Sequence, residues 1–219
     1  MNAPAASAEA PEARGSWFTA LVYDPMLWLG ERAGMAERRA RLLAGARGAV
    51  LEIGAGTGLN LERYPAGVER LVLTEPEEHM AKRLARRVAA AGSEAEVVRA
   101  SADALPFDDQ SFDTVVSTMV LCTVPDPQAA LGEISRVLRP GGRLLFCEHV
   151  RSEGERLARW QDRLHGPWAA FADGCRCNQP TPELLSDAGF TVEVSERDAW
   201  RRMPPLVRPL VAGHAQPHG

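Results

Sequence analysis

Three closely spaced glycines and one acidic residue are the positions of this sequence best suited to chemistry. Gly54, Gly56 and Gly58 form a G-x-G-x-G pattern after a β-branched run at 49–53, which predicts a buried strand entering a loop. Because glycine has no Cβ, such a loop turns sharply and lets a ligand approach the backbone closely. The residues that follow predict a helix, whose first N–H groups favour a carboxylate or a phosphate.

Glu75 adds a carboxylate at the end of the next predicted strand, about 20 residues after the first glycine. That spacing places an acidic group over the ribose hydroxyls of a nucleotide-like ligand. A dinucleotide-binding loop reads G-x-G-x-x-G, whereas here the third glycine comes one residue early and Glu52 precedes the first. The local pattern favours S-adenosylmethionine over NAD, and a glycine-rich turn without any ligand is the bland alternative.

Strands and helices alternate around this loop. The patterns predict strands at 49–53, 71–74, 95–99, 112–117 and 143–148, and helices at 77–91 and 127–138. Such alternation implies an α/β fold, a Rossmann-like, doubly wound and mostly parallel sheet. We expect a helical segment before it, at about 17–46, with Arg38, Arg39 and Arg41 on its solvated face.

A second pattern follows residue 150. Apolar residues recur there at helical spacing and predict a core stripe on a helix broken at 166–167, placed as a lid: Leu157, Trp160, Leu164, Trp168 and Phe171. One or two of those rings are candidates to line a pocket. Extended stretches at 190–196 and 206–215 are expected to add edge strands.

Composition limits the classes of function. The chain has 219 residues, 45% of them hydrophobic and 25% charged, and a net charge of −4, which suits one globular domain at 16–219 after a disordered tail at 1–15. We expect a cofactor half at about 48–150 and an acceptor half at about 151–215. No apolar run is long enough for a transmembrane helix, no signal peptide is visible, and nucleic acid is not an expected partner. Reduced cysteines and a cytoplasmic location are the expectation.

Four motifs in order resemble those of class I S-adenosylmethionine-dependent methyltransferases: Val50 to Gly58, Thr74-Glu75-Pro76, Ser101 to Phe107, and Leu138-Arg139-Pro140-Gly141-Gly142. The resemblance implies that the glycine loop, with Ala55, lies against the methionine part of the cofactor. It also implies that Glu75 holds both ribose hydroxyls and that the Ala102 N–H and Met80 meet the adenine. Ser101 stands where many members carry Asp, with Asp103 as a substitute acceptor. The expected cofactor set is completed by Tyr23, Glu52, Pro76 and Ser117.

Further matches resemble the methyltransferase-like group that includes the mammalian alkyl thiol S-methyltransferases: Val120-Leu121-Cys122, Phe146 to Val150, Trp160-Gln161, Pro167-Trp168, Phe171 to Cys175, and Leu206 to Pro209. The mammalian enzymes carry an N-terminal membrane anchor, which is not visible here, so a soluble relative is expected. The resemblance implies a small, fairly apolar acceptor, first of all a thiol. Quinone C-methylation, phospholipid N-methylation and non-catalytic S-adenosylmethionine binding are the alternatives.

A thiol acceptor must lose its proton, and His149 is the candidate base or substrate contact because it follows the fifth predicted strand. Asp173 is the second candidate, as a group that orients His149. Cys175 and Cys177 form a C-x-C whose nearest further ligand is His165, an incomplete set, so no metal is expected.

Overall fold

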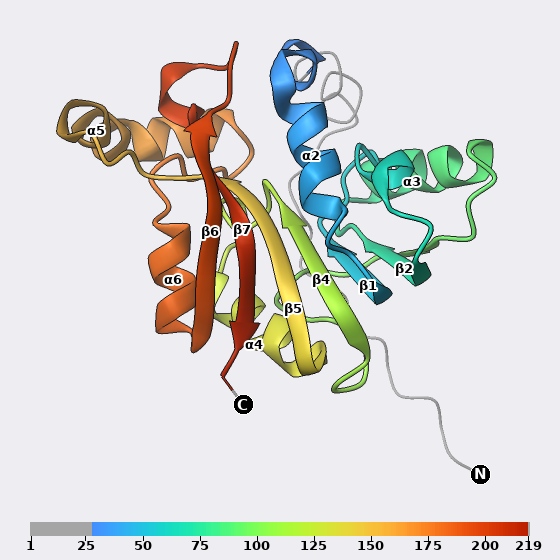
Figure 1. Ribbon diagram of the computed structural model, residues 1–219. Helices are drawn as coiled ribbons and strands as arrows, with labels where there is room; N and C mark the ends of the chain where they lie inside the picture. The colour runs from blue at the N-terminus through green and yellow to red at the C-terminus, as the bar shows by residue number, and fades with distance from the viewer. Residues whose placement is uncertain (1–27, 219) are drawn as a thin grey trace.

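The computed structural model describes residues 28–218. They contain a seven-stranded sheet (Figure 1). Its order is β3-β2-β1-β4-β5-β7-β6, and β1 to β5 pair in parallel while β7 is antiparallel to both neighbours. This confirms the predicted Rossmann-like α/β fold. The strands are β1 (Gly48–Ile53), β2 (Val68–Thr74), β3 (Glu96–Val98), β4 (Phe112–Thr118), β5 (Leu138–His149), β6 (Phe190–Ala199) and β7 (Pro209–Pro217).

Helices connect the strands, and two of them, α3 and α4, begin at an acidic cap. Glu77 accepts from the N–H groups of His79 and Met80 at the start of α3, and Asp126 caps α4 in the same way, as acidic N-cap residues do. The helices are η1 (Glu31–Met35), α2 (Ala36–Leu43), η2 (Leu61–Arg63), α3 (Glu78–Ala90), α4 (Pro127–Val137), α5 (Glu155–Phe171), α6 (Thr181–Asp187) and η3 (Pro205–Val207).

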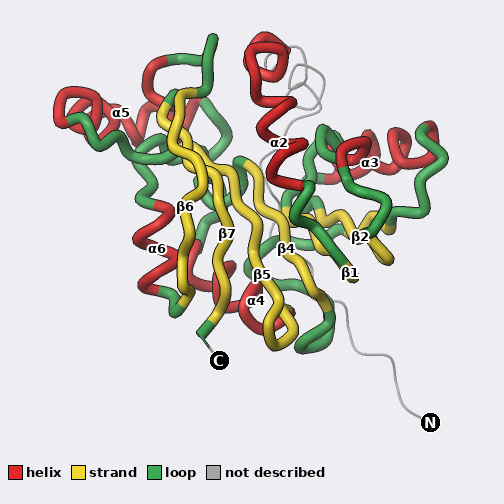
Figure 2. The backbone as a smooth tube through the Cα atoms, in the orientation of Figure 1, coloured by secondary structure: helices red, strands yellow, loops and turns green. Residues whose placement is uncertain are grey.

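Helices cover both faces of the sheet, as Figure 2 shows in its red and yellow tubes. Successive strand residues point to opposite faces. Leu51 packs in one apolar cluster with residues of α4 and α6, whereas its neighbour Val50 packs with Leu43 of α2. Leu84 of α3 packs with Leu73 of β2. The fold therefore buries two apolar layers, and the carboxyl ends of the parallel strands meet at one edge, where α5 lies beyond β5 (Figure 1).

The helical segment before the sheet differs from its prediction. Its described part begins at residue 28, and Gly34 interrupts the helix with a φ of 120°. Arg38 and Arg39 are buried rather than solvated. Arg38 pairs with Glu196 and Asp198 of β6, so the arginines connect α2 to the sheet.

The region after β5 corrects two further predictions. Helix α5 runs without a break through Pro167, although an interior proline lacks the N–H for one intrahelical hydrogen bond and its ring opposes the carbonyl four residues earlier. Trp160 and Phe171 are 56% and 78% exposed, so they are not core residues. Both predicted extra strands exist. Of these two, only β6 is an edge of the sheet, because β7 lies between β5 and β6.

Among the described helices, none combines the length and the apolar composition that crossing a membrane requires.

Candidate active site

The glycine loop after β1 is shaped by its own packing. Gly54, Gly56 and Gly58 have φ angles of 55°, 57° and 84°, a region that costs other residues roughly 1–2 kcal/mol. A Cβ on Gly54 would lie 2.7 Å from Cγ2 of Val120, and one on Gly58 would lie 2.8 Å from Cδ1 of Leu84. The loop is therefore fitted against the turn after β4 and against α3.

The helix expected after this loop does not form. The chain makes a series of turns and then the single 3-10 turn η2, which ends at Tyr64 in an extended conformation. Tyr64 precedes Pro65, and the residue before a proline is driven out of the helical region. The prediction of a helix N-terminus that binds an anion was therefore wrong at this position.

Glu52 lies beneath the loop and holds it to the sheet. Its Oε1 accepts from Asn60 Nδ2 at 2.8 Å, and its Oε2 accepts from the Tyr64 hydroxyl at 2.6 Å. Arg39 donates to Asn60 and to Thr118 in the same buried network. Burial raises the pKa of Glu52 to about 7 despite these donors. Its contacts support the loop, and its predicted contact to a cofactor stays a prediction.

Glu75 stands at the carboxyl end of β2 with its carboxylate against the glycine loop. Oε2 accepts from the Gly56 N–H at 2.9 Å and Oε1 accepts from the Glu77 N–H at 3.0 Å. Burial raises the pKa of this carboxyl, and the two N–H donors oppose that rise. Each oxygen retains a second lone pair for a ligand hydroxyl.

The residues expected around the adenine lie at the start of α3, just after Glu75, and in the loop after β3, the strand that pairs with β2. Met80 is buried in the first turn of α3, directly after Pro76 and the Glu77 cap. Ala102 is buried, whereas Ser101 and Asp103 are half-buried in the loop after β3. That loop is held by the N–H of Leu105, which donates to Glu133 of α4 at 2.8 Å.

Ser117 lies against a buried carboxylate, and its predicted contact to the cofactor stays a prediction. It is fully buried in β4, and its hydroxyl donates to Oε1 of Glu148 at 2.7 Å. The same oxygen accepts from the N–H groups of Val120 and Leu121. Burial raises the pKa of Glu148, and these donors oppose the rise. Glu148 thereby fixes the turn after β4, and sequence reasoning missed it although it is a lone charge at the end of an apolar strand.

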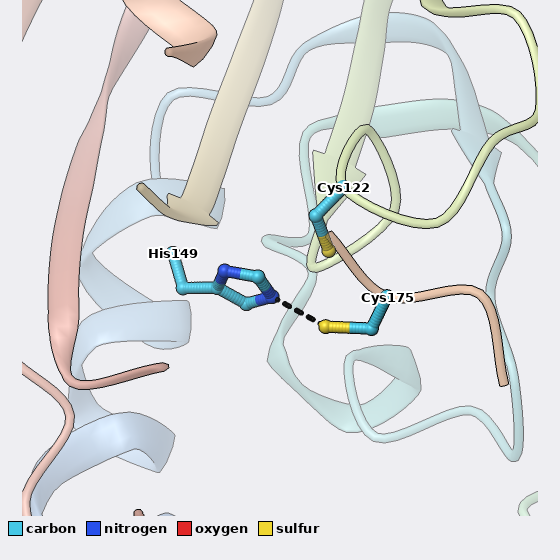
Figure 3. Close-up of side chains that lie close together, drawn as sticks. All are labelled: Cys122, His149 and Cys175. Carbon is cyan, nitrogen blue, oxygen red and sulfur yellow. Dashed lines mark hydrogen bonds between the residues drawn. The ribbon is translucent and has the colours of Figure 1, made fainter. Parts of the chain in front are cut away.

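His149 ends β5 and meets two cysteines that are distant in the sequence (Figure 3). Its Nε2 lies 3.0 Å from Sγ of Cys175, and its Nδ1 is buried without a hydrogen-bond partner. Donor atoms of Cys122, His149 and Cys175 all lie within 4.8 Å of one another. We call these three residues the sulfur–histidine cluster.

The electrostatics of this cluster distinguish its two thiols. The pKa of Cys175 is lowered because Cys122, His149 and Trp168 all interact with its sulfur. The pKa of Cys122 is raised by its interaction with Cys175 and by burial. Trp168 Nε1 donates to the Cys175 sulfur at 3.3 Å. Cys175 is therefore the thiol of the pair that most readily carries negative charge.

Several predicted residues lie outside this cluster. Asp173 is exposed in a turn with a φ of 49°, and among the described residues the partner of His149 is Cys175, so the expected Asp173–His149 pair does not form. His165 is bonded to a backbone carbonyl of α5, and Cys177 faces the Gln161 carbonyl, so these two do not join Cys175. Tyr23 and the tail at 1–15 lie outside the described residues.

Comparison with known proteins decides the family of this chain. Residues 51–146 match the family described as "Methyltransferase domain". A human protein named "Thiol S-methyltransferase TMT1B" is 39% identical over 183 residues, which cover 79% of this chain and 73% of the human chain. The chain belongs to the class I S-adenosylmethionine-dependent methyltransferases. S-adenosylmethionine is therefore its cofactor, and it supplies a methyl group carried on a positively charged sulfur.

Other methyltransferases are similar over comparable lengths. "Phosphatidylethanolamine N-methyltransferase" of Cereibacter sphaeroides is 34% identical and covers 65% of this chain and 74% of its own length. "Demethylmenaquinone methyltransferase" of Thermobifida fusca is 32% identical, with 70% and 71% covered. A solved SAM-dependent methyltransferase from Thermotoga maritima superposes with a TM-score of 0.67 at 23% identity, covering 92% of this chain and 98% of its own; this likeness shows the fold.

The residues of the loop fit such a cofactor. The Glu75 carboxylate is fixed beside the Gly56 N–H with lone pairs to spare. Met80 lies three residues beyond the Glu77 cap. The glycine loop and Glu75 come from adjacent strands of the sheet, at the edge where ligands bind in open α/β sheets.

Proposed function

We propose that this methyltransferase transfers the methyl group of S-adenosylmethionine to the sulfur of a small, fairly apolar thiol. The observation that carries the proposal is the 39% identity to a human protein named as a thiol S-methyltransferase. The position of His149 at the carboxyl end of β5, where α/β enzymes bind their ligands, supports it.

In this proposal the glycine loop and Glu75 hold the cofactor. Glu75 meets the ribose hydroxyls, and Ala102 and Met80 lie against the adenine. Gly54, Gly56 and their neighbours hold the methionine part at the edge of the sheet. The main task of the protein is then alignment, because a methyl group on a sulfonium is already activated and transfers by in-line displacement.

The acceptor thiol still has to lose its proton. A free thiol with a pKa of about 8.5 is only a few per cent thiolate at pH 7. We propose that the thiol of the acceptor lies beside His149, which either acts as its base or holds it in place. Asp173 is exposed, and among the described residues the hydrogen-bond partner of His149 is Cys175.

A panel of acceptors tests the proposal. Labelled S-adenosylmethionine is offered with hexanethiol, hydrogen sulfide, a quinol and phosphatidylethanolamine. We expect label on the thiols and a large loss of that label with His149→Ala. His165→Ala is the matched control, because that histidine is exposed and bonded only within α5.

The panel also separates the alternatives. The relatives named for demethylmenaquinone and phosphatidylethanolamine support a quinol or an amine as the second candidate acceptor. Label on the quinol or the amine alone contradicts the thiol. Tight S-adenosylmethionine binding without transfer to any acceptor identifies a non-catalytic binding module instead.

A further inference from the structure

The sulfur–histidine cluster brings together three metal-binding side chains from three separate segments. Cys122 lies in the turn after β4, His149 ends β5, and Cys175 lies in the loop after α5 (Figure 3). Their donor atoms lie within 4.8 Å of one another, and the group has these three members among the described residues. The sequence did not predict this set, because its members are far apart along the chain.

Backbone hydrogen bonds hold the segments in place without help from a ligand. Glu148 fixes the turn that carries Cys122 by accepting from Val120 and Leu121. The N–H of Arg176 donates to the carbonyl oxygen of Cys122 at 2.8 Å and joins the two cysteine segments directly. His149 is paired with Leu210 in the sheet. Donors placed in this way form a preorganised site.

The donor set matches one kind of ion. Two sulfurs and one imidazole suit zinc, which binds Cys and His in a tetrahedral arrangement. Three protein ligands leave the fourth position open, which is the arrangement of catalytic rather than structural zinc sites. The indole N–H of Trp168 donates to the Cys175 sulfur, as outer groups do to metal ligands.

We propose that Cys122, His149 and Cys175 bind a zinc ion whose open position takes the acceptor thiol. The inference rests on the proposed function and specifies how the thiol is activated. The thiol binds as a thiolate and its proton passes to water. The thiolate sulfur forms a bond to the methyl carbon while the bond from that carbon to the sulfonium breaks, and the electron pair stays on S-adenosylhomocysteine.

The step leaves zinc unchanged, since no electron is gained or lost. The product is a neutral thioether, a weaker ligand than a thiolate, so it dissociates and frees the position. In this arrangement His149 acts as a metal ligand, and deprotonation of the acceptor follows from coordination.

Metal content tests the site directly. We expect the full chain, purified without chelator, to hold one zinc ion by plasma mass spectrometry. Cys122→Ser, Cys175→Ser and His149→Ala should each lose it. Cys177→Ser is the matched control and should retain it, because the Cys177 sulfur faces the Gln161 carbonyl instead. Binding of S-adenosylhomocysteine by each variant shows that it has folded.

Cobalt gives a readout that does not depend on activity. Protein loaded with Co²⁺ should show thiolate-to-metal charge-transfer absorption, and hexanethiol should change the spectrum as it enters the open position. Loss of the charge-transfer band in Cys122→Ser and Cys175→Ser, but not in Cys177→Ser, places both sulfurs on the metal.

Three results overturn the inference. One is full-length protein that binds S-adenosylhomocysteine but takes up neither Zn²⁺ nor Co²⁺. Another is a disulfide between Cys122 and Cys175 in protein kept under reducing conditions. The third is unchanged thiol methylation after zinc has been removed, which leaves the proposed function intact. If the protein holds stoichiometric zinc but methylates no thiol, the proposed thiol acceptor is wrong, whereas the metal site is supported.

Discussion

In the proposed cofactor site, the Glu75 carboxylate is the charge that we expect to matter most for cofactor binding. We expect Glu75→Gln to weaken S-adenosylhomocysteine binding by about 1.5–3 kcal/mol, roughly 10- to 100-fold in Kd, because a charge-assisted contact to the ribose is lost. Isothermal titration measures the change. Glu78→Gln, which alters an exposed carboxylate at the start of α3, should leave Kd as it is. An unchanged Kd in Glu75→Gln would place the ribose elsewhere.

The buried Glu52 carboxyl should make stability depend on pH. Its pKa rises from 4.5 to about 7 on folding because of burial. Below pH 4.5 both states are protonated, whereas between there and pH 7 only the folded state keeps the proton. The Glu52 contribution to the free energy of unfolding therefore falls as pH rises, by roughly 3 kcal/mol at about 1.4 kcal/mol per pKa unit.

Glu52→Gln removes this ionisation and keeps an oxygen for Asn60. As pH rises from about 5 to about 8, we expect the variant to become more stable relative to the unaltered protein, because only the unaltered protein loses free energy of unfolding through Glu52. Urea titrations at several pH values measure the difference. A difference that stays flat with pH would mean that Glu52 is ionised throughout.

Single residues also show how far the sequence alone reaches. The spacing of Gly54 and Glu75 predicts their proximity, because parallel strands bring their ends to one edge. Nothing in the spacing of Cys122 and Cys175 predicts that both meet His149, since that contact depends on the path of the chain after α5. Arg39 was misplaced for a similar reason, because its partners Asn60 and Thr118 are tertiary contacts.

Among the elements, α5 is fastened to the neighbouring loops and to η3 by a polar residue, Gln161. Gln161 is fully buried. Its Nε2 donates to the carbonyls of Val150, Cys177 and Leu206, and its Oε1 accepts from Ser152. The periodicity of Trp160 and Phe171 predicts a helix correctly but assigns the wrong face to the core, because hydrophobicity ignores such a polar anchor.

We therefore expect Gln161→Leu to lower the free energy of unfolding by about 3 kcal/mol or more, because four backbone groups lose their partners. Trp160→Gln, on the adjacent exposed position, should change it by less than about 1 kcal/mol. Urea unfolding followed by circular dichroism compares the two. Equal losses would show that the aromatic face of α5 is covered in solution.

For the whole molecule, cofactor binding should appear as stability. At a concentration of about 100 times Kd, S-adenosylhomocysteine should stabilise the fold by about 2.7 kcal/mol, which is roughly 5–10 °C in Tm for a chain of this size. Differential scanning fluorimetry measures the shift, and NAD at the same concentration should give none. A rise in Tm with NAD but not with S-adenosylhomocysteine would mean that the glycine loop binds a dinucleotide.

The position of β7 in the sheet constrains how the protein is made. Strand β6 precedes β7 in the chain but pairs only with it, so during synthesis β6 has no place in the sheet until β7 has left the ribosome. Until then β6 is an unpaired strand that other chains could join. The strand carries Glu193, Glu196, Arg197 and Asp198, and charged side chains on an edge strand discourage such pairing. Until β7 is available, these charges therefore disfavour pairing of β6 with other chains.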